Sequence, residues 1–425
     1  MKNRSVLSTL FGACAFGVAA FGISAALAQD VPEKPASLNF YTTPEWARNV
    51  EPALAAFTTE HGIPVNVTVV PYDQLFTQLT TSILGGQQID VMELDPAWIP
   101  ELASQGMVVA LDGQVSADDL AVYLPGSTDL MKWDGELMGL PLVAGMPYFF
   151  YNTRMLADLG AEVPTTWADV EAVSKAAVDG GKADHGIFLG LAPLEGLMVY
   201  YDVFLKLEGG DWLSEDGTQF VFNSEAGVKA VEYMKHLVDT GVVPRAALET
   251  ADRDSLNTFL AGRAPFHFNW SFTYGIMKDP ERSKVADVVG SALVPGIVEP
   301  SYTSLGGGGY AVAATNASPY WAVELAKFAT TGEAAGNMLE GRGSDIAWAP
   351  LYEDATIFER LPLLATYVEQ VKYGGLRPSL SWYTEFRDNM ILPELHAALL
   401  GQIDAKTALD NAQAKAQAKL DKDGR

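Results

Sequence analysis

The sequence lacks most of the patterns on which enzymes and metal proteins rely. Cys14 is the only cysteine among 425 residues, and the five histidines are scattered without the spacing of a metal site. No G-x-S-x-G, H-E-x-x-H or G-x-x-x-x-G-K-[ST] pattern occurs. We therefore expect no disulfide in the exported chain, no metal, no other cofactor and no catalytic residue.

Positive charge is also scarce. Lys and Arg number 28 against 53 Asp and Glu, which gives a formal net charge of −25 at pH 7. A chain this acidic repels phosphate backbones, so we expect no nucleic-acid partner. Long apolar runs are missing too, because no segment after residue 28 is apolar over the length that a membrane span needs.

The first 28 residues have the pattern of a cleavable export signal. Lys2 and Arg4 precede an apolar stretch from about Val6 to Leu27, and Ala26-Leu27-Ala28 fits a signal-peptidase site. We therefore expect cleavage after residue 28 and a periplasmic location. Two alternatives remain open: acylation of Cys14, as in a lipoprotein, and retention of the apolar stretch as an anchor. The small residues and the Ala-x-Ala pattern favour export.

Length and hydrophobic pattern predict a two-lobed α/β protein. A chain of 425 residues is longer than one hydrophobic core usually serves. Between Leu38 and Leu111, strand-like runs alternate with amphipathic helices, which predicts βαβ units and a parallel sheet. Within this region Ile63 to Val69 alternates apolar and polar residues, so we expect a strand with one buried face.

Residues 133–152, WDGELMGLPLVAGMPYFFYN, mark the predicted crossing between the lobes. Asp134-Gly135 between apolar runs is typical of a two-residue hairpin. Pro141 cannot donate to a sheet ladder, so we expect two short strands here. Residues 285–295 predict a strand that returns to the first lobe. We assign residues 29–143 and 290–330 to lobe one, and residues 144–289 and 331–425 to lobe two.

Several weak sequence patterns follow one another in an order typical of one family of binding proteins. They are Gln88 to Asp95 followed by Leu102 to Gly106 and Leu111-Asp112, Gly135 to Pro141 leading to Tyr151-Asn152, Pro164 to Trp167, Phe259 to Arg263 leading to Trp270, Leu305 to Gly309 with Ala311-Val312, and Arg377-Pro378 leading to Trp382. In this order, behind an export signal, they resemble the family 1 extracellular solute-binding proteins. These are the sugar-binding subunits of ABC importers, here of the maltose/trehalose-binding type.

The resemblance implies a hinged, type II periplasmic binding protein fold with the ligand in the cleft between its lobes. It also implies a monomeric, non-enzymatic protein that binds a disaccharide or short oligosaccharide, such as an α-glucoside, and delivers it to transmembrane permease subunits. A sugar offers hydroxyl groups and apolar C–H faces, so its site needs carboxylates, amides and aromatic rings. Two alternatives stay open: the same fold binding a polyamine, a polyol or a phosphoester, and a secreted glycosidase.

The resemblance further implies ten candidate ligand-binding residues. They are Trp270, Trp382, Asp95, Glu45, Trp46, Tyr383, Glu195, Gly306, Gly307 and Gly308. Trp270 and Trp382 match positions where aromatic rings stack on sugar, with Tyr383 as the alternative to Trp382. The glycines can donate backbone N–H groups or admit the ligand.

Each kind of candidate also has a purely structural explanation. Large aromatic residues usually pack in a core, which applies to Trp270 and Trp382. Asp95 precedes Pro96 and is a good N-cap for a helix. Trp46 fits the apolar stripe of its own helix. A glycine run can also serve a tight turn that needs positive φ.

Overall fold

The computed structural model describes residues 31–343, 345–354 and 356–424. The predicted export signal, residues 1–28 with Cys14, lies outside the described residues. The chain divides into a short unit, Met1–Glu33, and a second unit, Lys34–Arg425, to which the following description applies. Within the described ranges, no helix has both the length and the apolar character needed to cross a membrane.

The first sheet has five strands in the order β2-β1-β3-β11-β6. The strands are β1 (Leu38–Thr42), β2 (Val65–Val69), β3 (Val91–Leu94), β6 (Leu140–Gly145) and β11 (Gly306–Val312). β1 pairs in parallel with β2 and with β3, whereas β11 runs antiparallel to β3 and to β6. The expectation of a parallel sheet is therefore right for three strands only. β6 and β11 come from later segments of the chain and do not belong to the βαβ units.

The edge strand β2 departs from its predicted burial. Val67 and Val69 are 41% and 48% exposed, although Ile63 just before the strand is buried. The apolar and polar alternation predicted one buried face, and this prediction is wrong. An edge strand has a neighbour on one side only, so the packing over its faces is incomplete.

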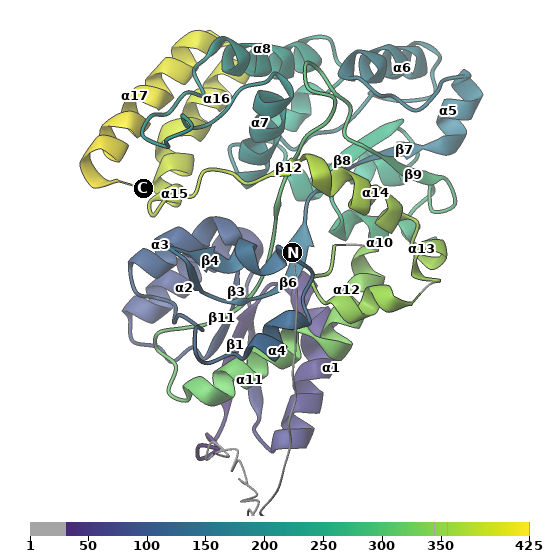
Figure 1. Cartoon of the computed structure of the whole chain (residues 1–425). Helices are drawn as coiled ribbons and strands as arrows, with labels where there is room; N and C mark the ends of the chain where they lie inside the picture. Colours follow the sequence, from purple (N-terminus) through teal and green to yellow (C-terminus); the bar gives the residue numbers. More distant parts are fainter. Residues whose placement is uncertain (1–30, 344, 355, 425) are drawn as a thin grey trace, which may run out of the picture. The chain divides into compact units, whose positions relative to one another are not determined.

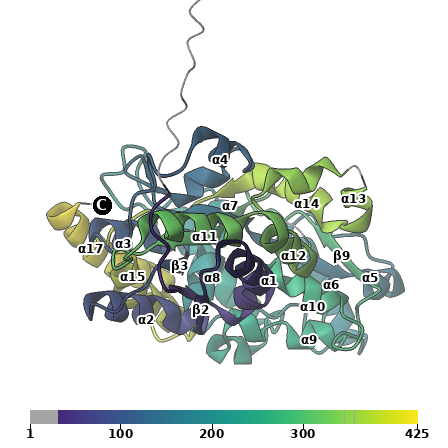
Figure 2. The same cartoon turned by 90° about the horizontal axis from the view of Figure 1, so that it is seen from below.

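Helices and short helical turns pack with the first sheet in one hydrophobic core. They are α1 (Pro44–His61), η1 (Pro96–Trp98), α2 (Tyr72–Leu84), α3 (Ile99–Ser104), α4 (Ala117–Ala121), η2 (Ser127–Met131), α11 (Pro319–Thr330), α12 (Gly332–Arg342), η5 (Ala349–Glu353) and α13 (Ile357–Arg360). In α1 the residues buried at helical spacing include Trp46, Val50, Leu54 and Phe57, as the sequence pattern predicts. Figures 1 and 2 show α1, α11 and α12 side by side.

The predicted crossing is confirmed. Asp134 and Gly135 have φ values of 50° and 84° and join β4 (Lys132–Trp133) to β5 (Glu136–Leu137), as a two-residue hairpin requires. β6 then ends at Gly145 in the first sheet, and β7 (Pro147–Asn152) begins two residues later in a different sheet. The single residue between them, Met146, is fully buried. The chain therefore passes from one sheet to the other through one packed residue.

The second sheet has three strands in the order β8-β7-β9, with β8 at Phe266–Trp270 and β9 at Val289–Ala292. Because β9 pairs with β7, the prediction that residues 285–295 return to the first lobe is wrong. The return comes later, through β10 (Thr303–Ser304) and the following β11. β10 pairs with β12 (Gly374–Gly375), which lies on another connecting segment.

The second core is mostly helical. Its helices and turns are α5 (Thr153–Leu159), α6 (Trp167–Asp179), α7 (Glu195–Leu207), α8 (Glu225–Asp239), η3 (Arg245–Glu249), α15 (Tyr383–Glu385), η7 (Phe386–Ile391), α16 (Leu392–Leu399) and α17 (Ala405–Asp423). A smaller cluster around Met146 involves residues from α9 (Asn257–Leu260), α10 (Phe272–Lys278) and α14 (Leu363–Gln370). The remaining short turns are η4 (Asp252–Asp254) and η6 (Val371–Tyr373).

The boundary expected at residues 330 and 331 differs from the observed cores. Most buried apolar residues from Ala334 to Leu364 belong to the first core, whereas the prediction placed residues 331–425 in lobe two. α12 follows α11 after a single residue and packs against α1. An amphipathic helix shows which of its faces is buried, but the sequence pattern does not show which core receives that face.

Candidate ligand-binding site

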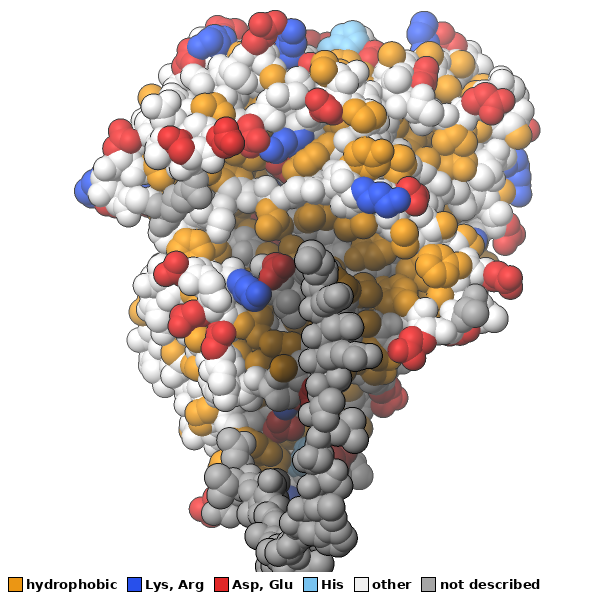
Figure 3. Space-filling view, in the orientation of Figure 1, with side chains coloured by type: hydrophobic (Ala, Val, Ile, Leu, Met, Phe, Trp, Pro, Cys, Tyr) orange, Lys and Arg blue, Asp and Glu red, His pale blue; other side chains and the backbone are white. Residues whose placement is uncertain are grey.

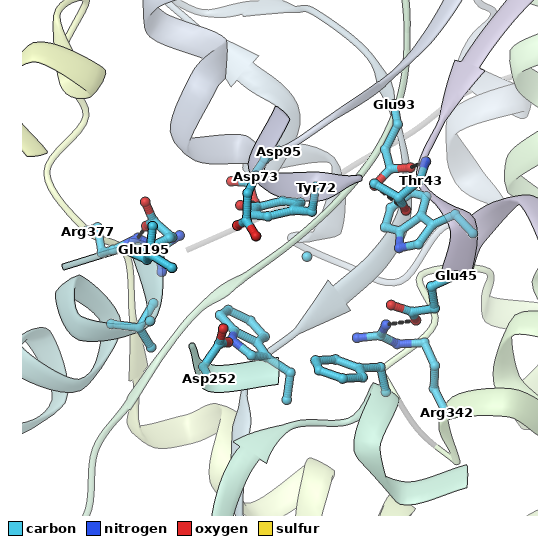
Figure 4. A pocket seen from close by; sticks show the side chains of 17 residues that line it. Thr43, Glu45, Tyr72, Asp73, Glu93, Asp95, Glu195, Asp252, Arg342 and Arg377 are labelled. Atoms are coloured by element: carbon cyan, nitrogen blue, oxygen red, sulfur yellow. Dashed lines mark hydrogen bonds and ion pairs between the residues drawn. The ribbon is translucent and has the colours of Figure 1, made fainter. Parts of the chain in front are cut away.

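A pocket lies between the two large cores and is lined by 17 residues (Figure 4). They are Thr43, Glu45, Trp46, Tyr72, Asp73, Glu93, Asp95, Gly307 and Arg342 on the side of the first core, Leu194, Glu195, Gly196, Val199, Asp252, Trp270 and Phe272 on the side of the second, and Arg377. About 750 Å³ of space free of atoms lies among these residues, part of it open to solvent.

The strands of the first sheet explain why polar residues gather here. Thr43 to Trp46 follow β1, Tyr72-Asp73 follow β2 and Asp95 follows β3. These three strands are parallel, so their carboxyl ends lie at one edge of the sheet. In open α/β sheets, ligands bind in the crevice outside the carboxyl ends of the strands.

Asp95 serves both as a helix cap and as part of the pocket wall. Its Oδ1 accepts a hydrogen bond from the Ala97 backbone N–H at 2.8 Å, which caps η1. Its Oδ2 accepts one from the Tyr72 hydroxyl at 2.9 Å. Burial raises the pKa of Asp95, and the nearby Arg377 opposes this shift. Asp95 therefore both caps η1 and lines the pocket.

Glu93 is the most deeply buried carboxylate of the pocket. It accepts hydrogen bonds from the Thr42 hydroxyl and the Thr43 backbone N–H, both at 2.7 Å, and from the Thr43 hydroxyl at 3.2 Å. Burial raises the pKa of Glu93 to about 7, although these hydrogen bonds lower it. Glu93 therefore titrates near neutral pH.

This titration predicts a pH-dependent stability. Between about pH 4.5 and 7 the folded protein holds a proton on Glu93 that the unfolded chain has released, so the free energy of unfolding falls as pH rises through this window. The loss is about 3 kcal/mol at most and is complete above pH 7. Denaturant unfolding at several pH values should show that the free energy of unfolding of Glu93→Gln changes less with pH than that of the wild type. Glu136 is exposed, so the control Glu136→Gln should keep the wild-type dependence of the unfolding free energy on pH. The same dependence in all three proteins would contradict the raised pKa of Glu93.

Two ion-paired guanidinium groups lie at opposite ends of the pocket (Figure 4). At one end Arg342 binds Glu45 at 2.7 Å and Asp345 at 3.2 Å. At the other end Arg377 Nε lies 3.2 Å from Glu195 Oε1, and Arg377 Nη1 donates to the Ser304 hydroxyl at 2.9 Å. Both arginines are at least nine-tenths buried, so their charges are held in place by these partners.

An aromatic wall faces these polar groups. Trp270 ends β8 and lies against Gly306 of the first sheet, where an added Cβ would be 2.6 Å from the indole Cη2 atom. Gly306 therefore admits the Trp270 ring between the sheets. Phe272 follows on the same wall. Trp46 also lines the pocket, but it is 6% exposed and packs edge-on against Tyr310 at 5.5 Å between ring centroids.

The sequence profile of the family described as bacterial extracellular solute-binding protein matches residues 43–336. The chain belongs to this family. Among curated relatives, a Brucella abortus (strain 2308) protein named as a binding protein is 27% identical over 222 residues, which are 50% of this chain and 54% of that protein. The galactooligosaccharide-binding protein of Bacillus subtilis (strain 168) is 25% identical over 262 residues, 58% of this chain and 61% of the relative. The chain thus spans little more than half the length of these curated relatives.

Solved structures of the same architecture cover far more of the chain. A Thermotoga maritima MalE3 structure with bound maltose superposes with a TM-score of 0.83 at 24% identity and covers 90% of this chain and 99% of that one. At this identity the similarity shows the fold. The solute-binding protein described here is therefore a two-lobed α/β protein of the periplasmic binding protein type, as the resemblance implied.

The structure brings six of the ten candidate residues together at the pocket of this solute-binding protein. These are Trp270, Asp95, Glu45, Trp46, Glu195 and Gly307. The other four, Trp382, Tyr383, Gly306 and Gly308, are not among the residues that line it. Gly306 nevertheless contacts the pocket wall through Trp270.

Trp382 and Tyr383 lie in the second core instead of at the pocket. The Trp382 ring lies 6.1 Å from both Phe220 and Phe386 between centroids, and its Nε1 donates to the Gly424 carbonyl at 2.8 Å. Tyr383 is fully buried, and its hydroxyl donates to Glu195 Oε1 at 2.7 Å. Tyr383 therefore contacts the pocket lining through Glu195.

The glycine run has a structural role at most of its positions. β11 contains Gly306 to Gly309 as a strand and not as the tight turn that the sequence offered as an alternative. Gly308 has φ of +142°, and a Cβ there would be 2.4 Å from the Leu94 carbonyl oxygen. This close approach between neighbouring strands explains the glycine without a ligand.

Sequence reasoning missed several residues that line the pocket. They are Thr43, Tyr72, Asp73, Glu93, Gly196, Asp252, Phe272, Arg342 and Arg377, with the apolar Leu194 and Val199. Tyr72-Asp73 follow a strand of the parallel sheet directly, a position that could have marked them. Arg342 and Asp252 carry no such signal, because only tertiary packing brings them to the pocket.

Proposed function

We propose that this protein is the carbohydrate-binding subunit of an ABC importer, which holds its ligand in the pocket between the two cores and delivers it to permease subunits. One observation carries the proposal: carboxylates, arginines and aromatic rings from both cores line a single pocket. Hydroxyl groups match the charged side chains, and the C–H faces of a sugar ring match Trp270 and Phe272. The names of the Bacillus subtilis relative and of the maltose-bound structure agree with a sugar ligand.

The two-sided lining also supports a hinged mechanism. A ligand that contacts Asp95 on one side and Trp270 on the other binds the closed arrangement better than an open one, so it shifts the population toward closure. X-ray scattering should show compaction on saturation with ligand. Unchanged scattering at saturating ligand would contradict this mechanism.

The arginines argue against a phosphoester ligand. Both guanidinium groups of the pocket are already bound to carboxylates of the same pocket, Arg342 to Glu45 and Arg377 to Glu195. A phosphate would have to compete with these buried partners. We further propose that the protein acts as a monomer without catalysing a reaction, and that the signal in residues 1–28 exports it to the periplasm.

A thermal-shift screen of residues 29–425 tests the proposed function. The panel holds trehalose, maltose, sucrose, monosaccharides, polyols, polyamines and phosphoesters. A ligand at one hundred times its Kd adds about 2.7 kcal/mol of stability, which is a clear shift in Tm. A response to one sugar, with that sugar recovered intact after long incubation, supports a non-enzymatic carbohydrate receptor. A response to a phosphoester alone would overturn the carbohydrate assignment and leave the solute-binding family intact.

A further inference from the structure

The two large cores also touch each other outside the pocket, at α3 and α15. α3 packs with the first core and α15 with the second, and the two helices are in contact. η1, which directly precedes α3, contacts α15 as well. Ala97 of η1 packs against apolar residues of both cores. These elements therefore form a second meeting place of the cores, in addition to the pocket.

A hydrogen bond between the cores accompanies this contact. The Thr384 backbone N–H donates to Glu101 Oε2 at 3.1 Å, between residues that are 283 positions apart. Glu101 lies in the first turn of α3, and Thr384 lies in α15. Both residues are partly buried. Because each residue belongs to a different core, the bond can form only while the cores are together.

The bond supplies a cap that α15 lacks in its own sequence. Trp382 is at the N-cap position of α15, and its side chain accepts no hydrogen bond from the first turn. The first N–H groups of a helix have no partner within the helix and need an acceptor elsewhere. α15 continues directly into η7 and α16, so a carboxylate at this end also interacts favourably with the helix dipole. Glu101 of the first core therefore caps a helix of the second.

Both sides of this contact are connected to the pocket. On the second core, Tyr383 precedes Thr384 and donates to Glu195 of the pocket at 2.7 Å. On the first core, Asp95 lines the pocket and caps η1, which leads directly into α3. A ligand that binds Glu195 and Asp95 therefore acts on the two helices that meet at Glu101 and Thr384.

The contact lies where an opening of the cleft would separate the cores. Figures 1 and 2 show α3 and α15 on the side of the molecule opposite α12, α13 and α14. The hydrophobic cluster around Met146, where the chain crosses between the cores, includes residues of α14. A rotation about this crossing would therefore move α3 away from α15 and break the Glu101 bond.

We propose that Glu101 is an affinity-determining residue outside the pocket, which stabilises the closed protein by capping α15 across the cleft. This inference rests on the hinged mechanism of the proposed function and adds a bond that the closed protein forms without ligand. When ligand binds the closed arrangement, the fraction of free protein in that arrangement sets the apparent affinity. Loss of the bond should lower the ratio of closed to open protein about fivefold, the effect of losing a typical helix cap.

The distance between two spin labels tests the inference on residues 29–425. This part of the sequence has no cysteine, so Leu84→Cys in α2 and Ala414→Cys in α17 provide the only thiols. Both positions are exposed, and Figure 3 shows charged side chains on the outer surface of α17. In the free protein, Glu101→Ala should shift the distance distribution to longer values. Glu101→Gln keeps an acceptor without the charge and should give an intermediate distribution.

Glu359→Ala is the matched control. Glu359 also lies in the first turn of a short helix of the first core, α13, but its side chain is exposed. This variant removes the same charge and should keep the wild-type distance distribution. In calorimetry with maltose, Glu101→Ala should bind about fivefold more weakly than the wild type, and Glu359→Ala should bind equally well.

The outcomes separate this inference from the proposed function. A wild-type distance distribution in Glu101→Ala would overturn the inference, and sugars that still raise the Tm would leave the carbohydrate receptor standing. A longer distance in Glu101→Ala, with no response of the Tm to any sugar of the panel, would support the contact and overturn the carbohydrate assignment. An equal lengthening in Glu359→Ala would overturn the inference, because the lost charge alone would then explain the opening.

Discussion

Arg377→Met should lower the free energy of unfolding by about 3 kcal/mol, because removal of one partner leaves buried carboxylates without their cation. Arg377 is 8% exposed and lies beside Glu195, Asp95 and the fully buried Asp202. Met keeps much of the side-chain volume, so the change isolates the charge. Burial already raises the pKa of Asp95 and Asp202, and both shifts should increase without the guanidinium. The variant should therefore lose less stability at acidic pH than at neutral pH.

Arg360→Met is the matched control for this prediction. Arg360 also pairs with carboxylates, Glu340 and Asp354, but its side chain is 47% exposed. Exposed pairs contribute at most about 1 kcal/mol, so the control should unfold nearly as the wild type does. Denaturant unfolding of both variants measures the difference. Equal, small losses in the two proteins would show that the Arg377 charge does not stabilise the fold.

Trp270→Ala should weaken ligand binding by about 1–3 kcal/mol, or about fivefold to 150-fold in Kd, with a smaller effect on stability. Trp270 is only partly buried and presents its ring to the pocket. Removal of the ring takes away the face on which a sugar stacks, while Gly306 simply loses a neighbour. Calorimetry with a sugar from the screen, together with denaturant unfolding, measures both effects.

Trp382→Ala should show the opposite pattern. Trp382 packs against Phe220 and Phe386 and donates to the Gly424 carbonyl, so truncation leaves a cavity in the second core. The expected loss is about 3–5 kcal/mol of stability, with ligand affinity unchanged. If Trp270→Ala lost stability and kept its affinity, the two tryptophans would have exchanged roles and the pocket assignment would be wrong.

At the Asp134-Gly135 hairpin and at the crossing beside Met146, the local sequence is sufficient to predict the structure. Positive φ at both turn residues follows from the residue types, and Pro141 limits the strand that precedes the crossing. By contrast, the sequence patterns at β2 and β9 correctly predicted strands. They did not predict the exposure of β2 or the strand with which β9 pairs. β2 lies at an edge, and β9 pairs with β7. Strand partners are long-range contacts, which an alternating pattern does not encode.

The residues of the candidate site also divide into those that the sequence predicts and those that it does not. Asp95, Glu45 and Trp46 are predictable because they directly follow strands of the parallel sheet, where ligands bind. Arg342 and Asp252 come from segments whose local pattern says nothing of a ligand. Trp382 and Trp270 are the same residue type, yet one packs in a core and the other lines the pocket.

The sequence by itself determined that this protein carries an export pattern, has α/β lobes, has no cysteine after residue 28, and belongs among the extracellular solute-binding proteins. Residue type, spacing and order along the chain are enough for each of these conclusions. Only the tertiary structure decided that residues through Leu364 pack in the first core, and that carboxylates from both cores meet in a pocket whose arginines are already paired. Charge balance within a site depends on distances between segments remote in sequence, and only the packing of the two cores sets those distances.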